Sequence, residues 1–180
     1  MALTKFNYNS FDVTSAASTA LGFNASANGF ATINPGSMTL IKTLTASSSS
    51  TLSFVDGSSD VVLDNTYPVY LFKFINMHPA TDNVNFTVNF RDGGSSYDAT
   101  KTSSSWGAYH DEGDSAAAVG YETSFDLAQS TSAQILGIGG SIGNGNDESL
   151  SGTLKLFNPS STTFVKHYIS NIHFYNKDNY

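Results

Sequence analysis

The chain lacks cysteine and has little charge. No cysteine occurs among its 180 residues, which excludes disulfides, thiolate zinc sites and iron–sulfur clusters. The fold must therefore be held by burial and hydrogen bonds alone. Charged residues make up only 13% of the chain, about half the share that is usual for a soluble domain. Serine, threonine, asparagine and glycine take their place, and such residues suit exposed strands and turns.

Positive charge is scarcest of all. Arg91 is the single arginine, the lysines are scattered, the net charge is −7 and the isoelectric point is about 4.7. Nucleic-acid binding depends on clustered lysine and arginine that displace counterions from phosphates. We therefore predict that the chain does not bind nucleic acid.

Long apolar runs are also missing. No segment approaches the roughly 18 apolar residues that a membrane-spanning helix needs, and the first ten residues, MALTKFNYNS, contain no apolar core of a signal peptide. We expect no membrane partner and synthesis in a cytoplasm. An extracellular-looking composition without an export signal or cysteine fits a protein released by lysis, as virion components are.

The clearest pattern lies in Tyr67–Arg91, where apolar residues make up two predicted strands. In the second, Val84, Phe86, Val88 and Phe90 alternate with polar residues, which places four apolar side chains on one face of a sheet. The first strand is nearly apolar on both faces and is typical of an interior strand. We expect the two to pair antiparallel across a turn at residues 76–83, in the middle of a β-sandwich.

Further strands are predicted over residues 38–45, 51–56, 61–63, 97–101, 105–110, 150–157 and 164–175. Residues 125–136 could form either a short helix or an irregular segment. The helix is considered because Phe125, Ala128, Ser132 and Leu136 have near-helical spacing. About eight strands with short connections favour an all-β fold, a jelly-roll-like antiparallel β-sandwich over residues 38–180. A polar tail follows the last strand, so the sandwich either lacks a closing strand or takes one from a neighbour.

Residues 1–37 show no sustained period, yet they contain apolar residues. These are Phe6, Tyr8, Phe11, Leu21, Phe23 and Phe30. We predict an extended N-terminal arm that orders by packing on its own domain or on a neighbour, with these six residues as its assembly contacts. A flexible leader is the alternative, because the segment alone buries too little to offset its ordering entropy.

One motif resembles the active site of a hydrolase. Gly139–Gly143 matches G-x-S-x-G, and Asp147, His167 and His173 follow in the order of a catalytic triad. That elbow requires a strand before it and a helix after it in a parallel sheet, and the sequence predicts neither. We interpret the segment as a glycine-rich loop and predict no catalytic residue and no enzymatic activity.

The sequence gives equally little support for a metal site. His167 and His173 would lie about 20 Å apart on one strand, too far for one ion, and His78 and His110 are interpreted as surface or core-edge residues. Asp111, Glu112 and Asp114 suit either a calcium loop or a solvated turn. We predict no metal and no cofactor.

Three aromatic residues, Trp106, Tyr109 and Tyr121, lie in the least regular segment. Exposed rings of this kind stack on sugars, whereas buried rings are commoner. They are candidate glycan contacts.

Four runs of the sequence are distinctive: FINMHPATD (residues 74–82), AYHDEGDSAAA (108–118), FDLAQST (125–131) and LFNPSSTTFVKH (156–167). With these runs the chain resembles structural proteins of marine tailed bacteriophages, especially cyanophages. The resemblance implies a non-enzymatic virion protein on the tail, a fibre or the capsid surface, made in the host cytoplasm. It also implies other virion proteins as partners. We expect a homo-oligomer, with a trimer among the options. A capsid decoration protein and a carbohydrate-binding adhesin for host attachment are the alternatives.

Overall fold

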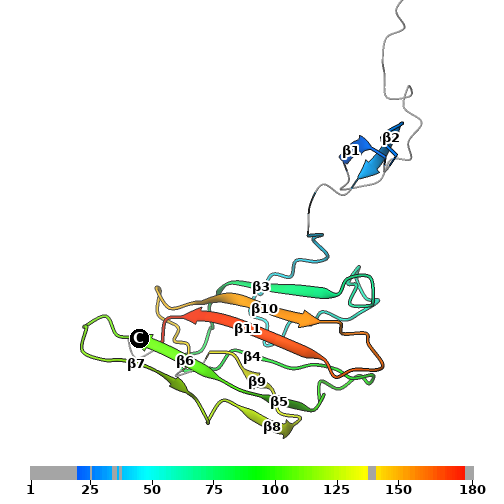
Figure 1. Cartoon of the computed structure of the whole chain (residues 1–180). Helices are drawn as coiled ribbons and strands as arrows, with labels where there is room; N and C mark the ends of the chain where they lie inside the picture. Colours follow the sequence, from blue (N-terminus) through cyan, green and yellow to red (C-terminus); the bar gives the residue numbers. More distant parts are fainter. Residues whose placement is uncertain (1–19, 25, 34–35, 37, 138–140, 177–180) are drawn as a thin grey trace, which may run out of the picture. The chain divides into compact units, whose positions relative to one another are not determined.

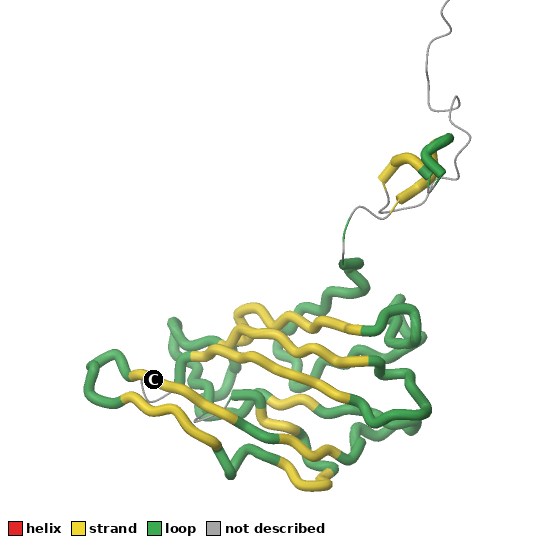
Figure 2. The backbone as a smooth tube through the Cα atoms, in the orientation of Figure 1, coloured by secondary structure: helices red, strands yellow, loops and turns green. Residues whose placement is uncertain are grey.

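The computed structural model describes residues 20–24, 26–33, 36, 38–137 and 141–176. The chain divides into two compact units, Met1–Thr43 and Leu44–Tyr180, whereas the sequence predicts a boundary after residue 37. The described residues form eleven strands and no helix (Figures 1 and 2). Every ladder between these strands is antiparallel. The prediction of an antiparallel all-β fold is confirmed, and the jelly-roll topology stays a prediction.

The described residues of the smaller unit contain one hairpin. Strand β1 (Ala20–Phe23) pairs with β2 (Phe30–Ile33), and the rings of Phe23 and Phe30 stack at 5.4 Å. Asn24 closes the turn, since its backbone N–H donates to the Gly29 carbonyl at 2.9 Å. Residues 20–33, predicted as part of an extended arm, therefore fold back because the Asn- and Gly-containing loop supplies turn chemistry. Phe6, Tyr8 and Phe11 lie outside the described residues.

The larger unit is built on a three-stranded sheet of order β11-β10-β3. It comprises β3 (Val69–Met77), β10 (Leu150–Phe157) and β11 (His167–Phe174). Strand β10 has the predicted bounds, and β11 is shorter than its predicted range of 164–175. On β10, Leu150, Leu154 and Leu156 are buried, so its even positions form the face that holds the sheet on the core.

Three further strand pairs complete the larger unit. Strand β4 (Thr87–Val88) pairs with β9 (Gln134–Ile135), and β5 (Lys101–Ser103) pairs with β8 (Leu127–Ser130). Strand β6 (Trp106–His110) pairs with β7 (Ala117–Tyr121) to form a hairpin.

The core lies between the three-stranded sheet and the segments around β4 and β9. Leu136, Leu154 and Leu156 form its buried centre. Aromatic contacts join the two layers, with ring centroids of Phe74 and Phe86 at 5.0 Å and those of Phe90 and Tyr168 at 5.2 Å. Side chains of the three-stranded sheet therefore pack against those of the segments around β4 and β9.

The predicted pairing within Tyr67–Arg91 is wrong. Strand β3 pairs with β10 and lies at the edge of its sheet, while β4 pairs with β9. The two segments meet through their side chains, Phe74 against Phe86, rather than through a shared ladder. Alternation identified the face that each segment buries, but it carries no information about which strand lies alongside. Positive φ angles at Asn76 (49°) and Asn83 (61°) redirect the chain between the two segments.

Two further expectations are corrected. Residues 125–136 form β8 and β9 instead of a helix, since Gln129 has a φ of 46°, outside the helical region. No strand ladder includes the described residues from 38 to 63. There, the Asp56 carboxylate accepts the Leu63 N–H at 2.8 Å and the Gly57 N–H donates to the Val61 carbonyl at 3.0 Å, so local turns take up backbone groups that a ladder would use.

The part of the chain that the structure describes contains no helix with the length and apolar character needed to cross a membrane.

Candidate functional site

The β6–β7 hairpin presents the three aromatic residues that the sequence singled out. Trp106, Tyr109 and Tyr121 are 69%, 45% and 43% exposed. Trp106 lies opposite Tyr121 in the ladder, and their rings meet edge to face at 5.3 Å. Tyr109 is three residues further along β6, and side chains alternate between the faces of a strand. The structure therefore brings Trp106 and Tyr121 together on one face and directs Tyr109 to the other.

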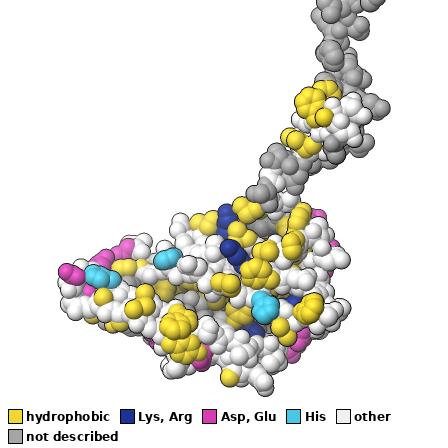
Figure 3. All heavy atoms as spheres, viewed as in Figure 1, with side chains coloured by type: hydrophobic (Ala, Val, Ile, Leu, Met, Phe, Trp, Pro, Cys, Tyr) yellow, Lys and Arg dark blue, Asp and Glu magenta, His cyan; other side chains and the backbone are white. Residues whose placement is uncertain are grey.

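A groove of about 560 Å³ lies beside this hairpin. Its walls are residues 106–110 of β6 and residues 170–174 of β11, with Leu136 and Asn176 also lining it. The face that carries β6 and β11 is shown in Figure 3, where acidic side chains gather at the tip of the hairpin. The groove thus joins two segments that are 60 residues or more apart in the sequence.

The groove lining is polar and includes the imidazoles of His110 and His173. Its lining contains no lysine, arginine, aspartate or glutamate. It combines an exposed indole and a phenol with the amides of Asn171 and Asn176 and the hydroxyl of Ser170. Such a surface suits an uncharged occupant that offers both apolar area and hydrogen-bonding groups.

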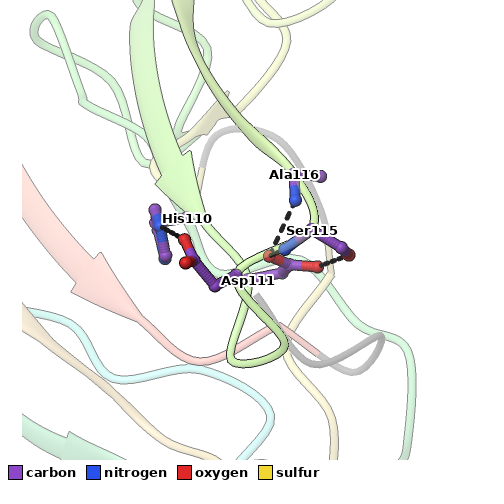
Figure 4. Close-up of polar contacts among 5 residues, drawn as sticks. His110, Asp111, Ser115 and Ala116 are labelled. Atoms are coloured by element: carbon purple, nitrogen blue, oxygen red, sulfur yellow. Dashed lines mark hydrogen bonds and ion pairs between the residues drawn. The ribbon is translucent and has the colours of Figure 1, made fainter.

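Asp111 fixes the tip of the hairpin (Figure 4). One carboxylate oxygen accepts the backbone N–H groups of Ser115 and Ala116, both at 2.8 Å, and the other accepts the Ser115 hydroxyl. The hydrogen bonds from the Ser115 side chain and the Ala116 backbone hold the pKa of Asp111 below its ordinary value. The tip therefore sets the register that places Trp106 opposite Tyr121.

Asp111, Glu112 and Asp114, which were considered as a calcium loop, lie in this turn. Asp114 lies 3.0 Å from Nε2 of His110, while the Asp111 carboxylate faces the turn backbone. Within the described ranges, no group of three or more histidine, aspartate or glutamate side chains could hold a metal ion.

The remaining histidines are dispersed. His78 contacts the Gly145 carbonyl at 2.9 Å through Nε2. His167 and His173 share the exposed face of β11. His173 lines the groove, as His110 does, whereas His78 and His167 are not among its lining residues.

Gly139 and Gly140 of the G-x-S-x-G segment lie outside the described residues. Ile142, next to Ser141, is buried and forms bridges with Val84 and Asn176. Among the residues that the structure describes, no hydrogen bond joins Ser141 to a histidine or a carboxylate. The segment that follows connects to β10, without the helix of a nucleophile elbow.

A buried polar cluster around Gln134 was not predicted from the sequence. Gln134 accepts hydrogen bonds from the hydroxyls of Ser103 (2.6 Å) and Tyr168 (3.0 Å), and its amide donates to the Phe125 carbonyl at 2.8 Å. It links β5, β9 and β11. A single glutamine carries no sequence signal for this role, because Ser103 and Tyr168 lie more than 30 residues away in the sequence.

Lys101 is also buried, with 6% of its surface exposed. Its ammonium donates to the Asn89 side-chain oxygen at 2.5 Å and the Ala99 carbonyl at 2.7 Å. Burial lowers its pKa, against the opposing effect of Asp92 and Asp98. Because both contacts are local and structural, we assign it to the scaffold.

The fold and the groove define a class: an antiparallel all-β domain with a neutral, aromatic-edged surface groove. Compared with family models, curated proteins and solved structures, the chain matches none.

Proposed function

We propose that the chain is a non-enzymatic structural protein of a tailed-phage particle, anchored by its N-terminal unit and displaying the larger unit on the tail or capsid surface. One observation carries this proposal: the β1–β2 hairpin exposes its apolar side chains. Leu21, Phe23, Phe30 and Ile33 are 49%, 68%, 48% and 39% exposed.

An isolated two-stranded hairpin is marginally stable in water. One that also exposes several large apolar side chains gains stability when another surface covers them, and such patches mark protein contacts. The acidic composition, with Arg91 as the single arginine, favours protein over nucleic acid as that surface. The hairpin thus has the properties of an assembly anchor.

The resemblance to phage structural proteins suggests that the partners belong to a phage particle. It supports other virion proteins as partners. We further propose that copies of the chain assemble with one another, and we favour a tail or fibre position over capsid decoration. The anchor buries apolar area against those partners, and the larger unit remains available at the surface.

The proposal is tested by replacing the two stacked rings. The double variant Phe23→Ser, Phe30→Ser removes apolar area and leaves the larger unit untouched. We expect wild-type chain to sediment as an oligomer at micromolar concentration and the variant to sediment as a monomer with an unchanged circular dichroism spectrum. Thr32→Ser, on the same hairpin, is the matched control and should keep the oligomer. An oligomer of unchanged mass in the double variant would refute the anchor.

A second candidate function, glycan binding by a host-attachment module, has one observation in its favour. Trp106 is 69% exposed and is held edge-on by Tyr121 beside a neutral groove. Indole faces of this kind stack on sugar rings. On a glycan array, Trp106→Ala should abolish binding, while Val119→Ala, an exposed apolar change on the same hairpin, should not. Absence of binding by the wild-type chain at high concentration would remove this candidate.

A further inference from the structure

Among the residues that the structure describes, strand β6 pairs along one backbone edge only, with β7. The Glu122 N–H donates to the Ser105 carbonyl at 2.9 Å, and the Asp111 N–H donates to the Ala116 carbonyl at 3.0 Å. These bonds join residues that lie opposite each other at the two ends of the ladder. Bonded and non-bonded pairs alternate in an antiparallel ladder, so the odd-numbered residues of β6 bond to β7. The N–H and C=O groups of Trp106, Ala108 and His110 therefore point away from β7.

Strand β11 also has a backbone edge that points away from its neighbour β10. The Tyr175 N–H donates to the Ser149 carbonyl at 3.1 Å, and the register of β10 with β11 continues from that pair. By the same alternation, the backbone groups of Tyr168, Ser170, Ile172 and Phe174 point away from β10. Within the described ranges, no hydrogen bond takes up the outward backbone groups of these four residues or of the three on β6.

The two free edges face the same groove. It is lined by five consecutive residues of β6 and five of β11, and by none of β7 or β10. Consecutive residues on one strand point to opposite faces, so a groove that touches all of them runs along the edge of the strand. Figure 1 shows β6 and β11 running in the same direction. One strand antiparallel to both would therefore fit the hydrogen-bonding polarity of both edges.

We propose that this groove accepts a β-strand, and that the strand is the N-terminal segment around Lys5–Asn9 of a second copy of the chain. Unpaired edges are templates for such strand addition. The inference rests on the proposed function in that it requires copies to assemble, and it adds the acceptor site and the donor segment.

The sequence of the segment matches the groove. Phe6 and Tyr8 alternate with Asn7 and Asn9, the period-two pattern of a strand with one apolar face. Apart from Lys5 at its start, the segment carries no charge. The groove lining contains no lysine, arginine, aspartate or glutamate, although it includes His110 and His173. Docking of residues 6–9 therefore buries no permanently charged side chain. The 19 residues that precede β1 span up to about 60 Å when extended.

Hydrogen exchange tests the acceptor site in the full chain. In assembled wild type, the outward amides of Ala108 and Ile172 should exchange at least about tenfold more slowly than in the variant Phe6→Asp, Tyr8→Asp. The amides of Gly107 and Tyr109, which bond within the hairpin, serve as internal controls and should not change. Equal exchange of the outward amides in wild type and variant would overturn the proposal.

A mixing experiment tests the donor. The Phe6→Asp, Tyr8→Asp variant, labelled with ¹⁵N, keeps an intact groove, and unlabelled wild type supplies intact arms. If the strand comes from a second copy, adding wild type should restore protection of the outward amides in the labelled chain. If those amides stay unprotected in the mixture, the second-copy donor is wrong.

Proline provides a matched pair of edge variants. Ala108→Pro removes an outward N–H on the groove side of the hairpin, and Val119→Pro makes the same change directly opposite, on the outer edge of β7. We expect only Ala108→Pro to abolish the arm-dependent protection of Ile172. Loss of that protection in both variants or in neither would count against the groove.

These outcomes are separable from those of the proposed function. Assembly that depends on Phe23 and Phe30, with groove amides that remain unprotected, would leave the anchor standing and refute strand addition. Protection of the same amides by a neutral oligosaccharide, with no effect of the arm variant, would identify a glycan as the occupant and overturn this inference.

Discussion

The three-stranded sheet and the β6–β7 hairpin are antiparallel ladders of similar chemistry with opposite surroundings. In the sheet, Leu150 and Leu154 are 0% and 1% exposed, whereas in the hairpin Trp106 and Val119 are 69% and 80% exposed. Both form backbone hydrogen bonds, so these bonds do not distinguish them. The contrast shows that burial makes one ladder a scaffold, and that its absence leaves the other available for binding.

The largest effect should come from the buried face of β10. Leu154→Ala removes a fully enclosed side chain and should lower the free energy of unfolding of the larger unit by about 2–5 kcal/mol, measured by urea denaturation. Ile169→Ala lies on the exposed face of the same sheet, at 64% exposure, and should cost less than about 0.5 kcal/mol. Similar losses in the two variants would contradict the assignment of the core face.

Glycine substitutions extend the comparison to both ladders. A Cβ at Gly152 would lie 2.4 Å from the Asn171 carbonyl oxygen, whereas one at Gly120 meets nothing within 4 Å. Gly152→Ala should therefore cost about 1–3 kcal/mol, measured by thermal and urea unfolding. Gly120→Ala, the matched change in the hairpin, should be neutral or slightly stabilising. Equal tolerance at both positions would show that the sheet is less tightly packed than described.

Tyr168 should give the sheet a dependence on alkaline pH. Burial raises its pKa, while the Ser103 hydroxyl acts in the opposite direction. The unfolded chain loses this proton near pH 10 while the folded chain keeps it, so stability is fully present below pH 10 and falls as pH rises through the raised pKa. Tyr168→Phe should cost about 1 kcal/mol at neutral pH and should flatten the alkaline decline.

The measurement for Tyr168 is the urea midpoint between pH 8 and pH 11. Tyr70, whose pKa is also raised mainly by burial, contributes in the same direction, so the decline should be reduced rather than removed. Tyr97→Phe alters a more exposed ring, at 38%, and is the control. An unchanged alkaline slope in Tyr168→Phe would contradict the buried position of this phenol.

The smallest effect on global stability should come from the hairpin tip. Asp111→Ala removes the acceptor of the Ser115 and Ala116 N–H groups. Amides of β6 and β7 should then exchange faster, while the urea midpoint of the larger unit stays unchanged. Because the pKa of Asp111 is lowered in the fold, its contribution is present above its ordinary value near 4 and is lost as pH falls through the lowered pKa. Unchanged hairpin exchange in Asp111→Ala would show that the carboxylate does not hold the turn.

The sequence predicted the fold class and the strands with strong local patterns. Strand β10 was located at its true bounds because Leu150, Leu154 and Leu156 mark one face. Strand β7 was missed because AAVGY has no alternation, and it becomes a strand through its turn with β6. Pairing also escaped prediction, since β3 finds its partner more than 70 residues further along the chain.

The candidate site was predictable only in part. Trp106 and Tyr121 were singled out, and the structure brings their rings into contact. The opposite wall, residues 170–174, could not be foreseen because it depends on how two separate sheets approach each other. The free edges that line the groove follow from hydrogen-bond register, which side-chain patterns do not encode.

The most direct test of the assembly role is a cryo-electron microscopy map of the chain in its assembled state. The account predicts that Phe23 and Phe30 of the β1–β2 hairpin lie buried against another polypeptide. A map in which both rings still face solvent in the assembly would contradict it.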